Sequence, residues 1–172
     1  MKQEASVIDL AAFVDVRGSF VKTFNDTLFQ SLGIPFTLKE SYFSVSAKDV
    51  IRGMHFQLPP HQHAKIVYCP FGAILDVALD LRLQSPTYGQ YFSQILSAEN
   101  HKAFYIPEGF AHGFKSLTHD AQTHYLVSSE YDAASDAGIA YHSFGFEWDC
   151  VDPILSERDK NFIAFQDFKS PF

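Results

Sequence analysis

The chain has 172 residues, enough for one domain with a substantial core but too few for two, so we expect a single domain over residues 1–172. Aromatic residues make up 16% of the sequence, with 18 Phe and 8 Tyr against 1 Trp, a composition that favours strands and aromatic pockets over a helical bundle. The net charge of −7 argues against nucleic acid as a partner, because phosphate-backbone binding needs a cationic face.

The N-terminal ten residues carry charges such as Glu4 and Asp9 and lack the apolar core of a signal peptide. No run of 18 apolar residues occurs in the sequence, so we expect no membrane association. Cys69 and Cys150 are the only cysteines, and a domain of this size needs no disulfide. We therefore expect a cytoplasmic protein, although the sequence leaves the pairing of the two cysteines open.

Two short helices and a series of strands are predicted along the chain. The first helix starts at an Asn25 or Asp26 cap and ends at Gly33, and the second starts near Ser156, where residues 156–159 have the form of a capping box. Apolar side chains at every second position, between turns rich in proline and glycine, predict strands at residues 41–46, 50–57, 65–69, 72–82, 91–97, 102–106 and 123–131. This spacing indicates an antiparallel sandwich or barrel.

Three cationic or titratable side chains gather in an otherwise apolar region of two predicted strands. Arg52 and His55 lie within one strand, and Lys65 begins the next. Since packing gives no reason for this cluster, we interpret it as a pocket for an anionic substrate with a proton-transferring histidine. The alternative is a core histidine bonded to a neighbouring strand. Strict alternation would place Arg52 and His55 on opposite faces, so a shared pocket requires an irregularity near Gly53.

Residues 104–114 contain the pattern Pro-x-Gly-x-x-His, which ends at His112 and resembles the second motif of the cupin jelly-roll superfamily. In metal-binding cupins that histidine is a ligand, and His61 and His63 imitate the first motif. The expected carboxylate is missing, however, and the ammonium group of Lys65 opposes a divalent ion. We therefore expect no bound metal, and keep a metal-dependent cupin enzyme using these three histidines as an alternative function.

Several other polar residues allow two interpretations. Asp76 and Asp80 share the second face of predicted strand 72–82, where they point to solvent or line a polar cavity. Tyr125 and Tyr131 share a face of predicted strand 123–131, and suit core packing as well as a pocket. Asp159 has a local role as the third helical residue of the capping box.

Taken together, seven segments in order along nearly the whole chain resemble the dTDP-4-dehydrorhamnose 3,5-epimerase family. They are DVRGSF at 15–20, RGMHFQ at 52–57, AK at 64–65, DVALDLR at 76–82, SPTYG at 85–89, IPEGFAHGF at 106–114 and LSERD at 155–159. The resemblance implies an all-β, cupin-like jelly-roll sandwich or barrel with a few short peripheral helices. It also implies a homodimer with exchanged N-terminal strand contacts, and an enzyme that uses neither metal nor cofactor.

The implied substrate is a nucleotide-linked 4-keto-6-deoxyhexose, inverted at C3, C5 or both through an enolate. An example is the conversion of dTDP-4-dehydro-6-deoxyglucose to dTDP-4-dehydrorhamnose. Other open functions are a single-carbon epimerase of another nucleotide 4-keto sugar and a catalytically silent binding protein. By resemblance, the base is His55, the enolate-stabilising cation is Lys65, the acid is Tyr125, and the carboxylate partner of the base is Asp159, beside its capping role.

The resemblance also implies a set of substrate-binding residues: Arg17, Phe20, Lys22, Glu40, Arg52, His112 and Tyr131. Of these, Arg17 and Phe20 match family residues that reach the nucleotide from the neighbouring subunit. The chain departs from the family pattern at Lys22, where glutamate is usual, and at Glu40 and Tyr42, where glutamine and asparagine are common. Because those positions lie near the nucleotide in the family, the preferred base is less certain than the keto-sugar.

Overall fold

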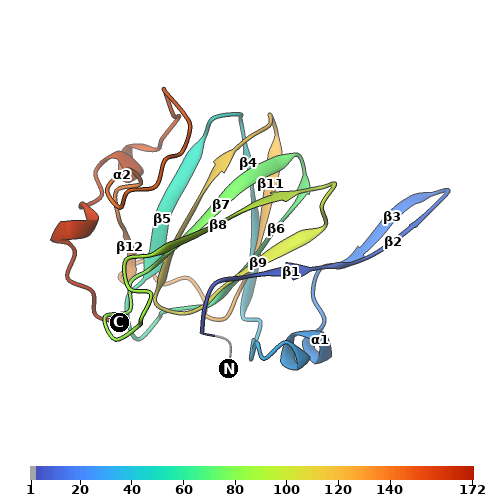
Figure 1. Cartoon of the computed structure of the whole chain (residues 1–172), viewed down its shortest axis with the longest axis horizontal. Helices are drawn as coiled ribbons and strands as arrows, with labels where there is room; N and C mark the ends of the chain where they lie inside the picture. The colour runs from blue at the N-terminus through green and yellow to red at the C-terminus, as the bar shows by residue number, and fades with distance from the viewer. Residues whose placement is uncertain (1–2) are drawn as a thin grey trace.

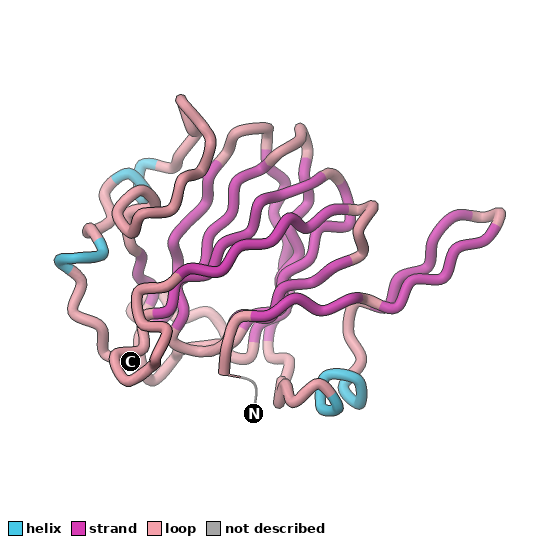
Figure 2. The backbone as a smooth tube through the Cα atoms, in the orientation of Figure 1, coloured by secondary structure: helices cyan, strands magenta, loops and turns pink. Residues whose placement is uncertain are grey.

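The computed structural model describes residues 3–172 as two antiparallel five-stranded sheets packed face to face (Figures 1 and 2). One sheet has the order β1 (Ser6–Asp9), β9 (Lys102–Ile106), β6 (Lys65–Phe71), β11 (Ala121–Val127) and β4 (Glu40–Ser46). The other has the order β12 (Asp136–Gly138), β5 (Ile51–Gln57), β10 (Phe110–Ser116), β7 (Ala73–Asp80) and β8 (Tyr91–Ser97). The predicted all-β sandwich is thereby confirmed.

A separate hairpin, β2 (Ala11–Asp15) and β3 (Gly18–Lys22), leaves the first sheet and projects away from the sandwich (Figure 1). Its apolar side chains are exposed, including Phe13 at 58% and Phe20 at 64%. Within one chain, Val21 at its base packs against the apolar cluster on the outer face of the first sheet, whereas most of its other side chains remain exposed.

Apolar side chains fill three layers of this sandwich. Between the sheets, Val67, Phe104 and Phe114 belong to the central cluster. A second cluster covers the outer face of the first sheet with the helix α1 (Asp26–Ser31) and the N-terminal segment. A third covers the outer face of the other sheet with the C-terminal segment, which contains α2 (Glu157–Lys160) and the 3-10 turn η1 (Phe165–Asp167). Because both faces of each sheet are covered, the strands are more continuously apolar than simple alternation predicts.

Both predicted helices are present and begin as their sequence signals indicate. The Asn25 side chain accepts a hydrogen bond from the amide of Leu28, and α1 ends before Gly33, whose φ is +75°. Ser156 caps α2 by accepting from the amide of Asp159 at 3.1 Å. None of the helices in residues 3–172 is long and apolar enough to cross a membrane.

The strand predictions were wrong in some places. Predicted strand 72–82 ends at Asp80, because the Asp80 carboxylate turns back to bond Arg82, Ser85 and Thr87. Predicted strand 123–131 runs instead from Ala121 to Val127. The sequence analysis missed β1, β2, β3, β10 and β12, which are short, interrupted by glycine or exposed.

The irregularity expected near Gly53 is present where β5 meets β10. His55 pairs with His112, and Arg52 pairs with Phe114. Between these pairs β10 contributes only Gly113, whereas β5 contributes two residues, so the register shifts. The extra residue reverses the alternation of side chains along β5, and Arg52 and His55 line the same cavity.

We expect Gly53→Ala to lower the free energy of unfolding by roughly 2–5 kcal/mol. Gly53 has φ +146°, and an added Cβ would lie 2.5 Å from the Cα of Gly113, which is rigid backbone. Gly145→Ala is the matched control, since Gly145 has φ +80° with open space around the new Cβ, and it should lose only about 1–2 kcal/mol. Denaturant unfolding measures both variants, and equal losses would show that the close approach to Gly113 is unimportant.

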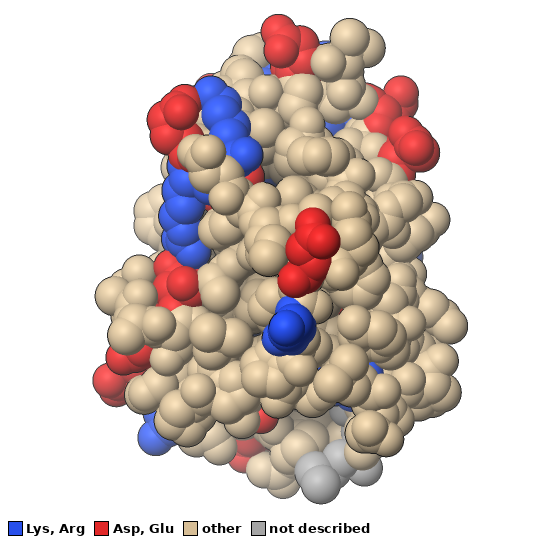
Figure 3. All heavy atoms as spheres, turned by 90° about the vertical axis from the view of Figure 1, so that its left-hand side faces the viewer, with Lys and Arg blue, Asp and Glu red and all other residues tan. Residues whose placement is uncertain are grey.

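Charged side chains of both signs are scattered over the face formed by the C-terminal segment (Figure 3). Most of this face is uncharged, and no continuous basic surface spans it (Figure 3). Nothing on this face has the cationic character that a nucleic-acid backbone would require.

Candidate active site

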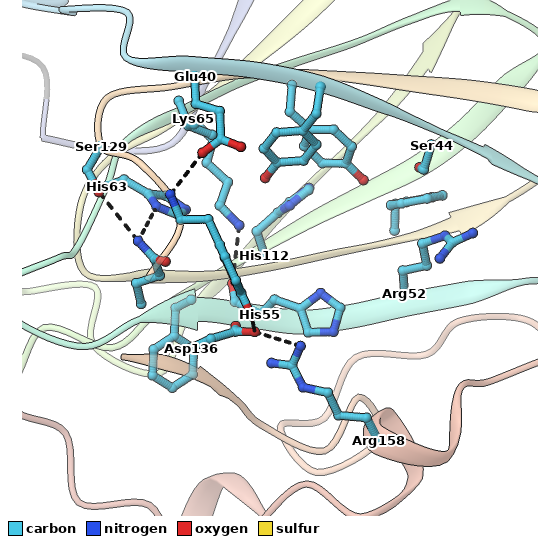
Figure 4. Close-up of a pocket in the computed structure, with 17 residues that line it drawn as sticks. Glu40, Ser44, Arg52, His55, His63, Lys65, His112, Ser129, Asp136 and Arg158 are labelled. Atoms are coloured by element: carbon cyan, nitrogen blue, oxygen red, sulfur yellow. Dashed lines mark hydrogen bonds and ion pairs between the residues drawn. The ribbon is translucent and has the colours of Figure 1, made fainter. Parts of the chain in front are cut away.

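A cavity of about 390 Å³ lies between the two sheets and is lined mainly by polar and aromatic side chains (Figure 4). His55 on β5 and His112 on β10 enter it from one sheet. Lys65 on β6 and Tyr125 on β11 enter from the other. His55, Lys65 and Tyr125, which the sequence placed on separate strands, therefore share one space with His112.

Asp159 orients the imidazole ring of His55. Its Oδ1 lies 2.9 Å from His55 Nε2, and its Oδ2 accepts from the amide of Gly53 at 3.2 Å. Burial raises the pKa of Asp159, but the bonds from His55 and Gly53 outweigh this and lower the pKa below its usual range. A carboxylate facing Nε2 holds the proton there, which leaves Nδ1 as the basic nitrogen of His55.

Asp159 thus combines the two roles considered from the sequence. Its backbone amide is capped by Ser156, and its carboxylate serves the histidine. The capping interaction therefore sets the position of the carboxylate that holds His55.

Lys65 is a cation that is almost fully buried, with 6% of its surface exposed. Its Nζ donates to the backbone carbonyl of His55 at 3.4 Å. Burial lowers the pKa of Lys65 to about 8, although the carboxylates of Asp76 and Asp136 favour the charged form. Below that pH the ammonium has few competing partners, so it is available to an oxyanion in the cavity.

Tyr125 faces the cavity from the opposite sheet to His55. Its ring stacks on Tyr42 with a centroid distance of 4.8 Å. Burial raises the pKa of the Tyr125 hydroxyl well above its usual value, so the phenol keeps its proton at neutral pH. The hydroxyl of Tyr125 can therefore donate a hydrogen bond into the cavity.

His112 forms a second histidine–carboxylate pair in the wall of the cavity. Its Nε2 lies 2.7 Å from Oδ1 of Asp76, and both residues are buried. The interpretation that Asp76 and Asp80 point to solvent is wrong, because both are fully buried. Asp76 supports a cavity residue, whereas Asp80 closes the turn after β7.

The mouth of the cavity is held by a chain of polar contacts. Glu40 accepts from the amide of Tyr131 at 2.8 Å, the Tyr131 hydroxyl lies 3.2 Å from Asp136, and Arg158 pairs with Asp136 at 2.7 Å. Tyr131 is in the loop after β11 and not on a strand with Tyr125, so that part of the prediction was wrong. It still lines the cavity, as do Glu40 and Arg52.

Three predicted substrate-binding residues do not line this cavity. Arg17, Phe20 and Lys22 lie on or beside the projecting β2–β3 hairpin (Figure 1). The Arg17 guanidinium pairs with Asp15 of the same hairpin. Within one chain these residues are therefore separate from the site.

The alternative metal site is not assembled. No group of three or more His, Cys, Asp or Glu side chains in residues 3–172 is arranged to hold a metal ion. His63 contacts Gln57, and His112 contacts Asp76.

Sequence reasoning missed several residues that line the cavity, namely Ser44, Gln57, Ser129, Asp136 and Arg158. Gln57 lies two residues after His55, so alternation along β5 would have found it. Asp136 and Arg158 had no comparable signal, because they meet only through the fold.

A jelly-roll sandwich that encloses an oriented imidazole, a buried ammonium and a protonated phenol on opposing walls defines an acid–base isomerase of carbonyl compounds. No residue of this set points to redox chemistry. The comparisons with known proteins agree with that class.

The chain belongs to the dTDP-4-dehydrorhamnose 3,5-epimerase family, whose sequence model matches residues 3–167. The enzyme of this name from Shigella flexneri is 38% identical over 94% of this chain and 91% of its own length. A dTDP-4-dehydrorhamnose 3-epimerase from Streptomyces niveus is 37% identical over 86% of this chain and 72% of its own.

Solved structures give the same result. The dTDP-6-deoxy-D-glucose-3,5-epimerase from Legionella pneumophila, in complex with dTDP-4-keto-L-rhamnose, matches with a TM-score of 0.92 and 33% identity. The match covers 98% of this chain and 92% of that one. The chain is therefore an isomerase of the sugar-nucleotide epimerase type.

Proposed function

We propose that this enzyme inverts both C3 and C5 of a dTDP-4-keto-6-deoxyhexose, with His55 as base and Tyr125 as acid. The observation that carries the proposal is their placement on opposing sheets, with Lys65 in the same cavity. Inversion requires that a proton leave one face of the carbon and arrive on the other. The dTDP-4-keto-L-rhamnose bound to the Legionella relative supports this choice of substrate.

The C4 ketone acidifies the hydrogens on C3 and C5, but an imidazole remains a weaker base than the enolate by roughly a dozen pKa units, or about 16 kcal/mol. His55 Nδ1 takes the proton, the C–H electrons form a carbon–carbon double bond, and the carbonyl electrons move to the C4 oxygen. The Lys65 ammonium stabilises that oxyanion, and Asp159 stabilises the imidazolium.

Tyr125 then gives its phenolic proton to the opposite face of the carbon, and the ketone re-forms. The imidazolium returns its proton to solvent, and the phenolate recovers one, so each inversion leaves the enzyme unchanged. A second inversion at the other carbon repeats the same proton transfers.

Product analysis tests this function. The enzyme should convert dTDP-4-dehydro-6-deoxyglucose to the isomer inverted at C3 and C5, as read from proton NMR couplings. The UDP-linked and GDP-linked substrates, assayed in parallel, determine the base preference. Inversion of one carbon alone would contradict the two-carbon proposal, and failure with all three substrates would contradict the epimerase function.

The protonation state of Lys65 should limit the reaction at alkaline pH. Lys65 is charged below its pKa of about 8, so kcat/KM should fall about tenfold per pH unit above that value. In Lys65→Arg this alkaline limb should be absent, because the guanidinium keeps its proton, even if the maximal rate is lower. A profile of the unaltered enzyme that stays flat to pH 10 would contradict the role of the ammonium.

We also propose that the active unit is a homodimer in which the β2–β3 hairpin of one copy reaches the site of the other. The cavity has three cationic side chains, Arg52, Lys65 and Arg158, against the carboxylates Glu40 and Asp136. Asp136 already neutralises Arg158. To bind a negatively charged nucleoside diphosphate, the site therefore needs further cations. The β2–β3 hairpin of a second copy would bring one of them, because it carries Lys22 beside exposed apolar side chains.

Light scattering on a sizing column tests the dimer. We expect a mass about twice the 19.4 kDa of the chain, and a shift toward the monomer when Phe13 and Phe20 are both replaced by serine. Val151→Ser, at a fully exposed position outside the hairpin, should leave the mass unchanged. A wild-type monomer with full activity would contradict the proposal.

We propose a cytoplasmic location. Cys69 and Cys150 are both free, as is usual for proteins of a reducing compartment.

A further inference from the structure

The side-chain amide of Gln57, in the wall of the cavity, is fixed by its backbone contacts. Its Oε1 accepts from the amide of Asp132 at 2.6 Å. Its Nε2 donates to the carbonyl oxygens of His61 at 2.7 Å and Glu130 at 3.2 Å. A reversed amide would face an oxygen toward two carbonyls and an NH₂ group toward an N–H, so only one orientation satisfies all three contacts.

This orientation determines the tautomer of His63. The Gln57 NH₂ group has two hydrogens: one serves the carbonyl oxygen of His61, and the other is shared between the carbonyl oxygen of Glu130 and Nδ1 of His63, which lies 3.1 Å away. Because an amide nitrogen cannot accept a hydrogen bond, Nδ1 faces a donor and carries the lone pair. The ring proton of neutral His63 is therefore on Nε2. Burial, together with the neighbouring Lys65 ammonium, lowers the pKa of His63 to about 3, so the ring is neutral at physiological pH.

The Nε2–H group of His63 has no hydrogen-bond partner within residues 3–172, although it is buried. Buried donors are nearly always paired in folded proteins, and leaving one unpaired is unfavourable. The ring itself lines the substrate cavity. A donor in this position is suited to a ligand atom that accepts a hydrogen bond.

The position of His63 in the cavity indicates which part of the substrate it would meet. Figure 4 shows His63 and Ser129 at one end and Arg52 and Ser44 at the other, with His55 between them. Arg52 is charged and exposed, which suits a diphosphate. A neutral donor at the opposite end, beside Lys65, suits an uncharged sugar oxygen (Figure 4).

We propose that His63 is a specificity-determining residue that donates its Nε2–H to an oxygen of the hexose. This inference rests on the proposed function for its substrate class. His63 and Lys65 both line the cavity, and a neutral ring adds a donor there without repelling the ammonium. The Gln57 amide acts as a positioning residue, because it sets which nitrogen carries the proton.

The tautomer is tested without any assay of activity. In a long-range ¹H–¹⁵N correlation spectrum of the full chain, His63 should show a protonated Nε2 and an unprotonated Nδ1 at pH 7. It should remain so at pH 5, because its pKa is about 3. A proton on Nδ1 at pH 7, or a doubly protonated His63 ring at pH 5, would overturn the inference.

Calorimetric binding tests the contact with the sugar. Wild type should bind dTDP-glucose, a stable analogue, more tightly than His63→Phe by roughly 5- to 30-fold, whereas dTDP should bind both equally. His63→Gln retains an N–H donor and should recover most of the difference. His61→Phe, at an exposed position beside the site, should change neither affinity.

The outcomes separate this inference from the proposed function. Wild type that binds neither dTDP nor dTDP-glucose would contradict the proposed function, while the tautomer measurement would stand. Equal binding of dTDP-glucose by wild type and His63→Phe would overturn the inference alone. Equal loss of dTDP and dTDP-glucose binding in His63→Phe would also overturn it, because the effect would then be structural.

Discussion

Replacing His55 by alanine is expected to abolish exchange of both the C3 and the C5 hydrogen of the substrate with solvent deuterium. The loss should be about 10²–10⁴-fold, which is what general-base catalysis contributes. His112 also pairs with a carboxylate, that of Asp76, but it is buried, and burial lowers its pKa. NMR of the keto-sugar in deuterium oxide measures both positions at once.

Tyr125→Phe is the matched control for this experiment. Phenylalanine keeps the stacking on Tyr42 but removes the acidic proton. His55 should still remove the substrate proton and return a deuteron to the same face, so exchange stays measurable while inversion falls. Full exchange in His55→Ala would contradict its role as base, and complete loss of exchange in Tyr125→Phe would contradict the division of roles.

Lys65→Met should lower kcat by about 10²–10³-fold while leaving the protein at least as stable. Methionine fills a similar volume but cannot hold the enolate oxygen, and removal of a single oxyanion donor typically lowers kcat by 10²–10³-fold. The charged Lys65 is unfavourable in its buried position, since its pKa of about 8 lies below the usual lysine value of 10.5. At neutral pH this corresponds to a folding penalty on the order of 3 kcal/mol that methionine would relieve.

Opposite changes in activity and stability distinguish a catalytic role from a structural one. Thermal unfolding of Lys65→Met at pH 7 should occur at the same temperature as wild type or higher, alongside the loss of kcat. Lys115→Met is the control for a structural buried lysine, because Lys115 donates to the carbonyl oxygens of Trp148 and Asp149. That variant should unfold at a lower temperature, and the same pattern in Lys65→Met would count against the oxyanion role.

Much of the sandwich was predictable, because apolar side chains at every second position mark most of its strands. The strands around Leu75, Phe104 and Ile95 were found in this way, and caps at Asn25 and Ser156 located both helices. The strand β10 was missed because its residues were interpreted as a motif rather than as a strand, although all seven are buried. Hairpin β2–β3 was missed because most of its side chains are exposed within its own chain, so no clear apolar alternation marks it.

For the site, His55 and Lys65 were identified because they cluster with Arg52 in an otherwise apolar region. Gly53 was identified as the place where the alternation of side chains must break. It did not predict that Asp76 would lie against His112, since that contact depends on the register of two adjacent strands. Nor did it find the pairing of Asp136 with Arg158, which are 22 positions apart and meet through the C-terminal segment. Pairings of this kind are properties of the fold, not of local pattern.

A primary deuterium isotope effect tests most directly whether an imidazole removes carbon-bound hydrogen with an ammonium at the ketone oxygen. Substrate carrying deuterium at C3 or at C5 should react more slowly than unlabelled substrate under single-turnover conditions, and Lys65→Met should show an effect at least as large. The deuterium removed from C3 or C5 should then appear in solvent water. Retention of the label in an inverted product, without loss to solvent, would contradict the mechanism.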